Sequence, residues 1–441
     1  MDSKQIVLNN FDEMVSTLQK VITFDTVKSA PQPNAPFGNG ARECLDFVLA
    51  LAKEWGLDTY DDDGFAGHVD YKGTGDEVLG ILGHLDVVPA KESDGWIHPP
   101  FGGVIDNGKL FGRGTMDDKG PMIACLYAVK ALKESGFVPS KTIRLIFGCD
   151  EESGMQCVKH YFDHMPKPTV SFSPDGDFPV INREKGIYQF DINFGKIDSN
   201  VLDIYAGERT NVVAGKCVTK LSKTVDLGEY ANLFEDAGDC YALTTHGKNA
   251  HGSTPQEGLN ATWKTFEVLA KLFPNDKALG FVASKMLDYT GAAWGIKLTD
   301  AESGALTCNI GVVRVVDGCL KISVDVRFPV TYTCDQFYNL VTSVTPYQVC
   351  PDHISEPLFV PADSFLVETL LSTYDDAVGG KSEPLAIGGG TYSRCLPNCV
   401  AFGPLFPGEE QTIHMPNEAI SLDNLKKMTL IYLDAIQRLS K

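Results

Sequence analysis

Apolar and polar positions along the chain follow two recurring patterns, one typical of helices and one typical of buried strands. Helical spacing of apolar residues predicts three helices in the first part of the chain, at Asp12–Phe24, Ala41–Trp55 and Pro121–Ser135. Continuous apolar runs predict buried strands at Val78–Val88, Thr142–Gly148 and Thr169–Phe172. Strands that alternate with helices indicate an α/β domain with a largely parallel sheet.

In the middle of the chain the pattern changes. Ile187–Phe194 alternates like a half-exposed strand, and Asn260–Phe273 has the amphipathic pattern of a helix. Thr307–Phe328 predicts two strands joined by a hairpin turn at Asp317-Gly318. Alternating strands with helices on one side indicate an α+β domain.

The α/β pattern returns near the end, with helices at Ser364–Val378 and Leu422–Leu439 and a strand at Cys399–Leu405. A chain of 441 residues is long enough for two domains. We therefore expect one α/β catalytic domain built from residues 1–185 and 356–441, interrupted by a second domain over residues 186–355.

Composition and charge narrow the function classes. The hydrophobic content of 43% and the charged content of 22% are typical of a folded globular protein. A formal net charge of -20 repels phosphate backbones and anionic lipids, so we expect no nucleic-acid and no membrane partner. The start of the chain lacks a signal-peptide pattern and the 12 cysteines show no CxxC spacing, which indicates reduced thiols and a cytoplasmic location.

Residues able to bind metals follow the predicted strands, where open α/β sheets place their ligand sites. His84 and Asp86 end the first buried strand on one face, so the carboxylate could fix the tautomer of a metal-binding imidazole. For an isolated pair, a surface histidine beside a strand-terminal aspartate is the commoner interpretation. Asp117 and Asp118 lie in the glycine-bracketed segment Gly112–Gly120, and a cap on the following helix is a reasonable alternative for Asp118 but a weaker one for the whole segment.

Asp150-Glu151-Glu152 lies at the tip of a buried strand, where three carboxylates repel one another unless a cation neutralises them. Asp175 and Asp177 follow a further strand, and His414 appears much later. Each signal is weak alone. Together they form a mixed nitrogen and oxygen ligand set that suits zinc or manganese.

The chain resembles the di-zinc peptidase clan of carboxypeptidase G, succinyl-diaminopimelate desuccinylase and carnosinase. Four blocks carry this resemblance: Gly83–Pro89, Gly112–Gly120, Asp150–Ser153 and His251–Ser253. Other segments are most similar to the bacterial dipeptidase V type: Ser173–Asp175, Gly207–Arg209, Gly388–Tyr392 and His414–Glu418. The resemblance implies a zinc-exopeptidase-like α/β catalytic domain with a mixed, mainly parallel sheet, interrupted by an α+β lid domain.

The resemblance also implies roles for individual residues. It assigns two Zn²⁺ ions, with Mn²⁺ or Co²⁺ as substitutes, to His84, Asp175, Glu152, His414 and a bridging Asp117. Asp86 would orient His84, and Glu151 would be the general base that acts on a metal-activated water. A cis peptide bond is expected between Asp117 and Asp118.

The remaining implied residues bind substrate. His251, with Asn211 beside it, would donate to the developing oxyanion, although His251 alone reads as a loop histidine. Arg327 would clamp the substrate carboxylate, and a salt bridge with Asp325 is its equal rival. The glycine run that ends at Gly390 would let the backbone approach a ligand closely, with a glycine-rich phosphate cradle as the competing interpretation. Thr391 and Arg394 would help bind the substrate's C-terminal carboxylate.

These inferences predict a metallodipeptidase that cleaves dipeptides or very short peptides. The alternatives are an N-acyl amino acid amidohydrolase of the same clan and a catalytically silent metal-binding protein. The resemblance to dipeptidase V favours a monomer, with a dimer formed through the lid as the alternative.

Overall fold

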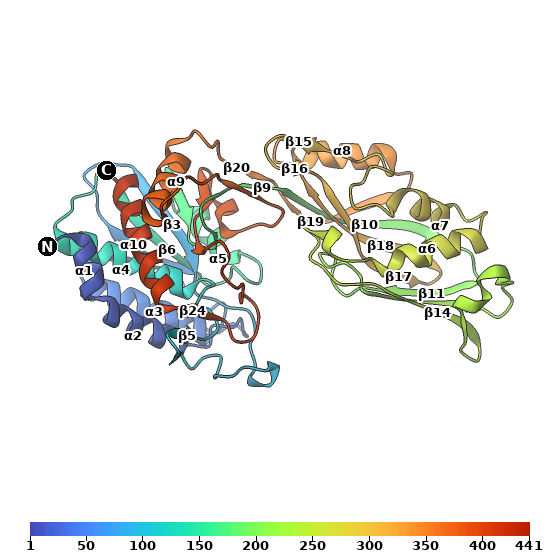
Figure 1. Ribbon diagram of the computed structural model, residues 1–441, viewed down its shortest axis with the longest axis horizontal. Helices are drawn as coiled ribbons and strands as arrows, with labels where there is room; N and C mark the ends of the chain where they lie inside the picture. Colours follow the sequence, from blue (N-terminus) through green and yellow to red (C-terminus); the bar gives the residue numbers. More distant parts are fainter. The chain divides into compact units, whose positions relative to one another are not determined.

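The computed structural model describes residues 1–441, and their contacts divide the chain into two units (Figure 1). The first unit contains Met1–Asn182, Val360–Leu385 and Thr391–Lys441; the second contains Arg183–Phe359 and Ala386–Gly390. These limits lie within a few residues of the predicted ones, but the return of residues 386–390 to the second unit was not predicted. None of the helices combines the length and apolarity that crossing a membrane requires.

A mixed sheet forms the centre of the first unit. Seven of its nine strands are, in spatial order, β1 (Asp58–Asp62), β2 (Ala66–Tyr71), β6 (Thr142–Gly148), β3 (Val78–His84), β7 (Val170–Ser173), β22 (Cys399–Ala401) and β9 (Ile181–Glu184). The β6–β3, β3–β7 and β7–β22 pairs are parallel, whereas the outer pairs are antiparallel. The expected mixed sheet with a mainly parallel centre is therefore confirmed.

Helices bury this sheet. The helix α4 (Lys119–Ser135) packs on β3 and β6, and nearly all of its residues are buried because its sequence is apolar on every side. It ends at Gly136, whose left-handed φ of 78° is easily adopted by glycine. The helices around α4 are α1 (Ser3–Asn9), α2 (Phe11–Ile22) and α10 (Leu422–Leu439). On the β1–β2 side, α3 (Asn39–Glu54) contacts both strands and α5 (Gln156–His164) contacts β2.

The second unit is built on an antiparallel sheet of eight strands. In spatial order these are β13 (Glu235–Asp236), β14 (Cys240–His246), β12 (Lys216–Ser222), β11 (Val201–Ala206), β17 (Thr307–Val316), β18 (Cys319–Phe328), β10 (Gly186–Lys196) and β19 (Gln348–Ser355). Asp317 and Gly318 both have positive φ, as a tight hairpin turn requires, so the predicted β17–β18 hairpin is confirmed.

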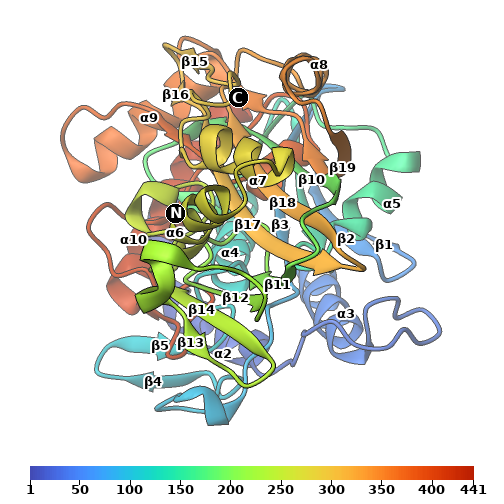
Figure 2. The same ribbon diagram turned by 90° about the vertical axis from the view of Figure 1, so that its right-hand side faces the viewer.

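Three helices cover this antiparallel sheet: α6 (Ala261–Leu272), α7 (Lys277–Phe281) and α8 (Cys334–Val344). Helix α6 contacts β12 and β14, and α8 contacts β10 and β19. Figure 2 shows α6 and α7 lying over the strands of this unit. The apolar faces of these helices, with Phe266 of α6 and Phe337 of α8, share one core with inward residues of the strands such as Phe190 of β10.

Candidate metal centre

The parallel strands β3, β6 and β7 end at one edge of the first unit's sheet. In parallel strands the carboxyl ends meet, so the loops that follow His84, Gly148 and Ser173 start side by side. His414 is brought to this edge by a small antiparallel sheet. In this sheet β24 (Ala419–Ser421), which follows His414, pairs with β5 (Lys109–Phe111), which precedes the Gly112–Gly120 segment. Topology therefore gathers residues that are up to 330 positions apart in sequence.

The carboxylate of Asp117 lies between two imidazoles. Its Oδ1 is 3.0 Å from His84 Nε2, and its Oδ2 is 2.9 Å from His414 Nε2. The His414 Nε2 is also 2.9 Å from Glu152 Oε1, and His84 Nε2 is 4.0 Å from Asp175 Oδ2. Two ligand groups, one with His84 and Asp175 and one with His414 and Glu152, therefore share Asp117.

The backbone of Asp86, rather than its side chain, orients His84. His84 Nδ1 donates to the Asp86 carbonyl oxygen at 2.9 Å, while the nearer Asp86 carboxylate oxygen is 3.6 Å away. That carboxylate instead accepts hydrogen bonds from the backbone N–H groups of Glu151 and Glu152, both at 3.0 Å. Because a carbonyl can only accept, Nδ1 carries a proton, and Nε2 is the ring nitrogen that faces Asp117.

The acidic groups of the cluster strongly shift one another's pKa values. Burial, followed by the charges of Asp175, Glu152 and Asp117, raises the pKa of Glu151 well above its usual value although His84 opposes this. Burial and the Asp117 charge likewise raise the pKa of Asp175 to about 7. Burial would also raise the pKa of Asp117, but hydrogen bonds from His414 and His84 lower it.

The imidazoles compensate for this negative charge. Hydrogen bonds to Asp117 and Glu152 raise the pKa of His414 to about 10 despite burial. Burial would lower the pKa of His84, but the hydrogen bond and charge of Asp117, helped by Asp86, raise it well above its usual value. Protons thus serve as the cations of this cluster, and a bound metal ion would replace them.

Glu418 was not predicted to have a role, although it ends the His414–Glu418 block. It is fully buried, and its carboxylate accepts from Arg113 Nη1 at 2.7 Å and from the backbone N–H groups of Gly114, Met116 and Asp117 at 2.9–3.3 Å. These bonds fix the turn that presents Asp117. Only the position of a carboxylate within a recognised block could have indicated this in the sequence.

Two other acidic candidates lie outside the ligand groups. The expected cis peptide bond joins Asp117 to Asp118, and the Asp118 Oδ2 accepts from the His84 backbone N–H at 3.2 Å. The other oxygen of Asp118 is buried without a hydrogen-bond partner, and burial raises the pKa of this carboxyl well above its usual value. Asp177 is in β8 (Gly176–Asp177), which pairs with β23 (Pro404–Leu405), and does not join the cluster.

The donor set fits divalent metal ions. Two imidazole nitrogens and several carboxylate oxygens converge, and one carboxylate faces both imidazoles with separate oxygens. Zinc accepts this combination, as do manganese and cobalt. Each ligand group also includes a side chain that is partly open to solvent, so ions and small substrates can reach it.

Three of the predicted substrate-binding residues, Asn211, His251 and Arg327, lie in the second unit. The Gly252 N–H donates to the Asn211 carbonyl at 2.7 Å, and a β-carbon on Gly252 would lie 2.1 Å from Asp325 Oδ2. The neighbouring His251 Nδ1 is 2.7 Å from Ser253 Oγ, and partial burial, then the charge of Arg327, lowers the pKa of His251.

Arg327 is almost completely buried and its charge is matched. Its Nε is 3.1 Å from both oxygens of Asp325, and its Nη1 donates to the Gly388 carbonyl at 3.1 Å. The salt bridge that rivalled the substrate clamp is therefore present. The role of Arg327 toward substrate remains a prediction.

The remaining predicted substrate-binding residues belong to different units: Gly390 to the second, and Thr391 and Arg394 to the first. Gly390 ends the short segment that belongs to the second unit, and Thr391 begins the following segment of the first. The Thr391 side chain accepts from the backbone N–H of Ser393 and so caps the short helix η5 (Tyr392–Cys395), which contains Arg394. Their predicted contact with a substrate carboxylate is untested.

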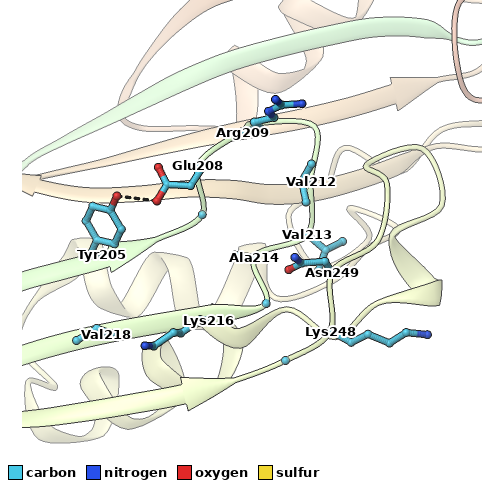
Figure 3. A pocket seen from close by; sticks show the side chains of 13 residues that line it. Tyr205, Glu208, Arg209, Val212, Val213, Ala214, Lys216, Val218, Lys248 and Asn249 are labelled. Carbon is cyan, nitrogen blue, oxygen red and sulfur yellow. Dashed lines mark hydrogen bonds between the residues drawn. The ribbon is translucent and has the colours of Figure 1, made fainter. Parts of the chain in front are cut away.

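A cavity of about 850 Å³ lies in the second unit beside the segment that carries Asn211 (Figure 3). Its basic side chains, Arg209, Lys216 and Lys248, point in different directions, and Glu208 accepts a hydrogen bond from Tyr205 at 2.7 Å. The side chains do not converge on one point, so the cavity has no evident catalytic centre.

The first unit's fold defines a zinc-exopeptidase-like α/β protein. A sequence profile of the family described as "Peptidase family M20/M25/M40" matches residues 80–438. The chain belongs to this peptidase family.

Relatives and solved structures agree with this assignment. The chain is 34% identical over 460 residues to "Putative dipeptidase YtjP" of Bacillus subtilis (strain 168), and the match covers 99% of each chain. It is also 34% identical over 468 residues to "Putative dipeptidase" of Staphylococcus epidermidis, again with 99% of each covered. The fold resembles human carnosine dipeptidase 1 with a TM-score of 0.58 at 14% identity, covering 99% of this chain and 98% of that one.

Proposed function

We propose that this protein is a metal-dependent dipeptidase that uses two divalent ions, zinc in the first instance, bound around Asp117. One observation carries the proposal: the two oxygens of the Asp117 carboxylate face the imidazoles of His84 and His414 separately. A carboxylate in that position is suited to bridging two cations. Peptide-bond hydrolysis follows from the family, and the dipeptide substrate is supported by the names of the relatives.

The proposed ligands fall into two sets with one shared member. His84 and Asp175 would hold one ion, His414 and Glu152 would hold the other, and Asp117 would contact both. When bound, the ions would lower the pKa of water toward neutrality and polarise the scissile carbonyl. Manganese or cobalt would serve as substitutes because they accept the same ligands.

Glu151 is the proposed general base. Asp86 anchors the Glu151 backbone, and Glu151 belongs to a ligand-distance group with His84 and Glu152. Bound cations would favour the ionised form of Glu151, which would accept a proton from the attacking water and then pass it to the leaving amine. Such a two-way transfer needs a side chain that is held in place yet remains accessible, and Glu151 is only half-buried.

We also propose that His251 and Asn211 bind the substrate. His251 is the proposed oxyanion donor, since an imidazole with a lowered pKa stays neutral near pH 7 and still carries one N–H. Asn211, fixed through its backbone to Gly252, is the proposed neighbouring donor.

The test is a Glu151→Gln substitution, which keeps the size of the side chain but removes the base. We expect kcat for a dipeptide with added zinc to fall by roughly 100- to 10,000-fold, with zinc binding retained. Glu134→Gln is the matched control, because Glu134 lies on α4 as a solvent-exposed partner of Lys130. It should leave kcat unchanged. Full activity in Glu151→Gln would contradict the proposed base.

A substrate panel distinguishes the alternatives that share this metal centre. Wild-type protein should hydrolyse dipeptides faster than tripeptides or N-acyl amino acids when zinc, manganese or cobalt is supplied. Preference for N-acyl amino acids would identify an amidohydrolase instead. Intact substrates under every metal would indicate a catalytically silent protein.

A further inference from the structure

A second cluster of histidines and a carboxylate lies in the first unit and shares no residue with the proposed catalytic centre. Asp62, at the end of β1, faces His160 and His164 on α5. The Asp62 Oδ2 is 2.8 Å from His160 Nδ1, and its Oδ1 is 2.6 Å from His164 Nε2. All three ligand atoms lie within 4.8 Å of one another.

Two rigid elements hold these side chains. His160 and His164 are four residues apart on α5, so both project from the same face of the helix. Asp62 pairs with Ala66 in the β1–β2 ladder, and α5 packs on β2. The arrangement therefore depends on a strand and a helix rather than on loops.

Asp62 pairs with no lysine or arginine; besides the two histidines, its carboxylate accepts a hydrogen bond from the Tyr60 hydroxyl at 3.4 Å. Asp62 is only 2% exposed, and both of its ion-pair partners are histidines. A buried carboxylate needs a cation or several hydrogen-bond donors, and a metal ion bound between Asp62 and the two histidines would supply the positive charge.

The two rings are oriented and reachable. His160 stacks on Phe65 with ring centroids 3.9 Å apart and an angle of 4°, which fixes its plane. The His160 and His164 side chains are 35% and 45% exposed, respectively, so an ion can enter and water can complete its coordination.

We propose that Asp62, His160 and His164 form a peripheral site for a borderline divalent transition-metal ion of the Zn²⁺ type. Two imidazole nitrogens and one carboxylate oxygen are a common zinc ligand set. Ligand atoms around tetrahedral zinc are about 3.3 Å apart, given bonds of about 2.0–2.1 Å. The present N···O distances, 2.8 Å from His160 to Asp62 Oδ2 and 2.6 Å from His164 to Asp62 Oδ1, need to widen by less than 1 Å.

The bound ion would tie α5 to β1. Helix α5 begins four residues after Glu152, and the Asp150 carboxylate accepts from the Gln156 N–H at the start of this helix at 3.1 Å. A cation at the peripheral site therefore stabilises the segment that follows the acidic residues Asp150-Glu151-Glu152. The competing interpretation is a plain ion-pair cluster without metal.

Zinc binding by the full-length protein separates these interpretations. Chelator-treated protein is dialysed to equilibrium against Zn²⁺, and bound zinc per chain is measured for wild type, His164→Gln and His160→Gln. His98→Gln is the matched control, because His98 lies 3.4 Å from Asp106 as an isolated, partly exposed pair. We expect both cluster variants to bind one zinc ion fewer than wild type, and the control to match wild type.

Equal zinc binding by wild type and the folded cluster variants would overturn the peripheral site. Circular dichroism in chelator verifies that each variant is folded, and His164→Gln is the safer change because its side chain is the more exposed. As a second readout, added Zn²⁺ should raise Tm more in wild type than in His164→Gln, and an equal rise would also overturn the site. The difference between variants does not depend on how many ions the catalytic centre binds.

Discussion

The acidic cluster around Asp117 and the polar cluster around His251 use the same residue types in opposite ways. Around Asp117, carboxylates outnumber the imidazoles, and the pKa values of Glu151, Asp175 and His414 all rise in response. Around His251, the only buried cation, Arg327, is already matched by Asp325, and the pKa of His251 falls.

This difference indicates what each cluster can bind. An excess of buried negative charge favours cations, so the first cluster suits metal ions. The second cluster is already neutralised and does not favour a cation, and we propose that its neutral N–H donors bind a substrate oxygen. The predictions below test this contrast, from the largest effect to the smallest.

The largest effect on stability is expected from Asp325→Asn. The substitution preserves shape but leaves the buried Arg327 charge without its partner, so it should lower the free energy of unfolding by about 3–5 kcal/mol. Asp191→Asn is the control, because Asp191 pairs with the half-exposed Lys321 between the neighbouring strands β10 and β18. Its cost should stay below about 1 kcal/mol. Similar losses in both variants, measured by urea unfolding, would show that Arg327 is not specially dependent on Asp325.

A somewhat smaller effect is expected from His251→Ala. Loss of one oxyanion donor should reduce kcat by roughly 100- to 1,000-fold, equivalent to about 2.7–4 kcal/mol. Bound zinc per chain should not change, because His251 is in none of the candidate ligand groups. A fall in zinc content that parallels the loss of activity would remove the distinction between the two clusters.

Strong local patterns made much of the fold predictable. The strand Thr142–Gly148, the helix Leu422–Leu439 and the hairpin about Asp317-Gly318 occur as expected, since periodicity and turn chemistry act over a few residues. The short helix Ser3–Asn9 was missed because its apolar pattern spans only two turns. The edge strand Asp58–Asp62 was missed because it is mostly acidic and joins the sheet through tertiary pairing.

The candidate site was less accessible to reasoning from residues alone. His84, Asp117 and His414 are individually ordinary, and only the family resemblance linked them before the sheet edge brought them together. The sequence could not show which atom of Asp86 contacts His84: its carbonyl oxygen, not its carboxylate, accepts the hydrogen bond from His84 Nδ1. The buried support from Glu418 depends on a long-range pairing of β24 with β5 that no local pattern encodes.

The proposal that Asp117 bridges two ions is tested most directly by counting zinc in Asp117→Asn, which keeps the shape of the side chain but replaces one ligand oxygen by an amide nitrogen. Asp177→Asn is the matched control, since Asp177 is near the same sheet edge but outside the ligand groups. We predict that folded Asp117→Asn binds two zinc ions fewer than wild type and that Asp177→Asn binds as many as wild type. Undiminished zinc binding by Asp117→Asn would contradict the shared-carboxylate site.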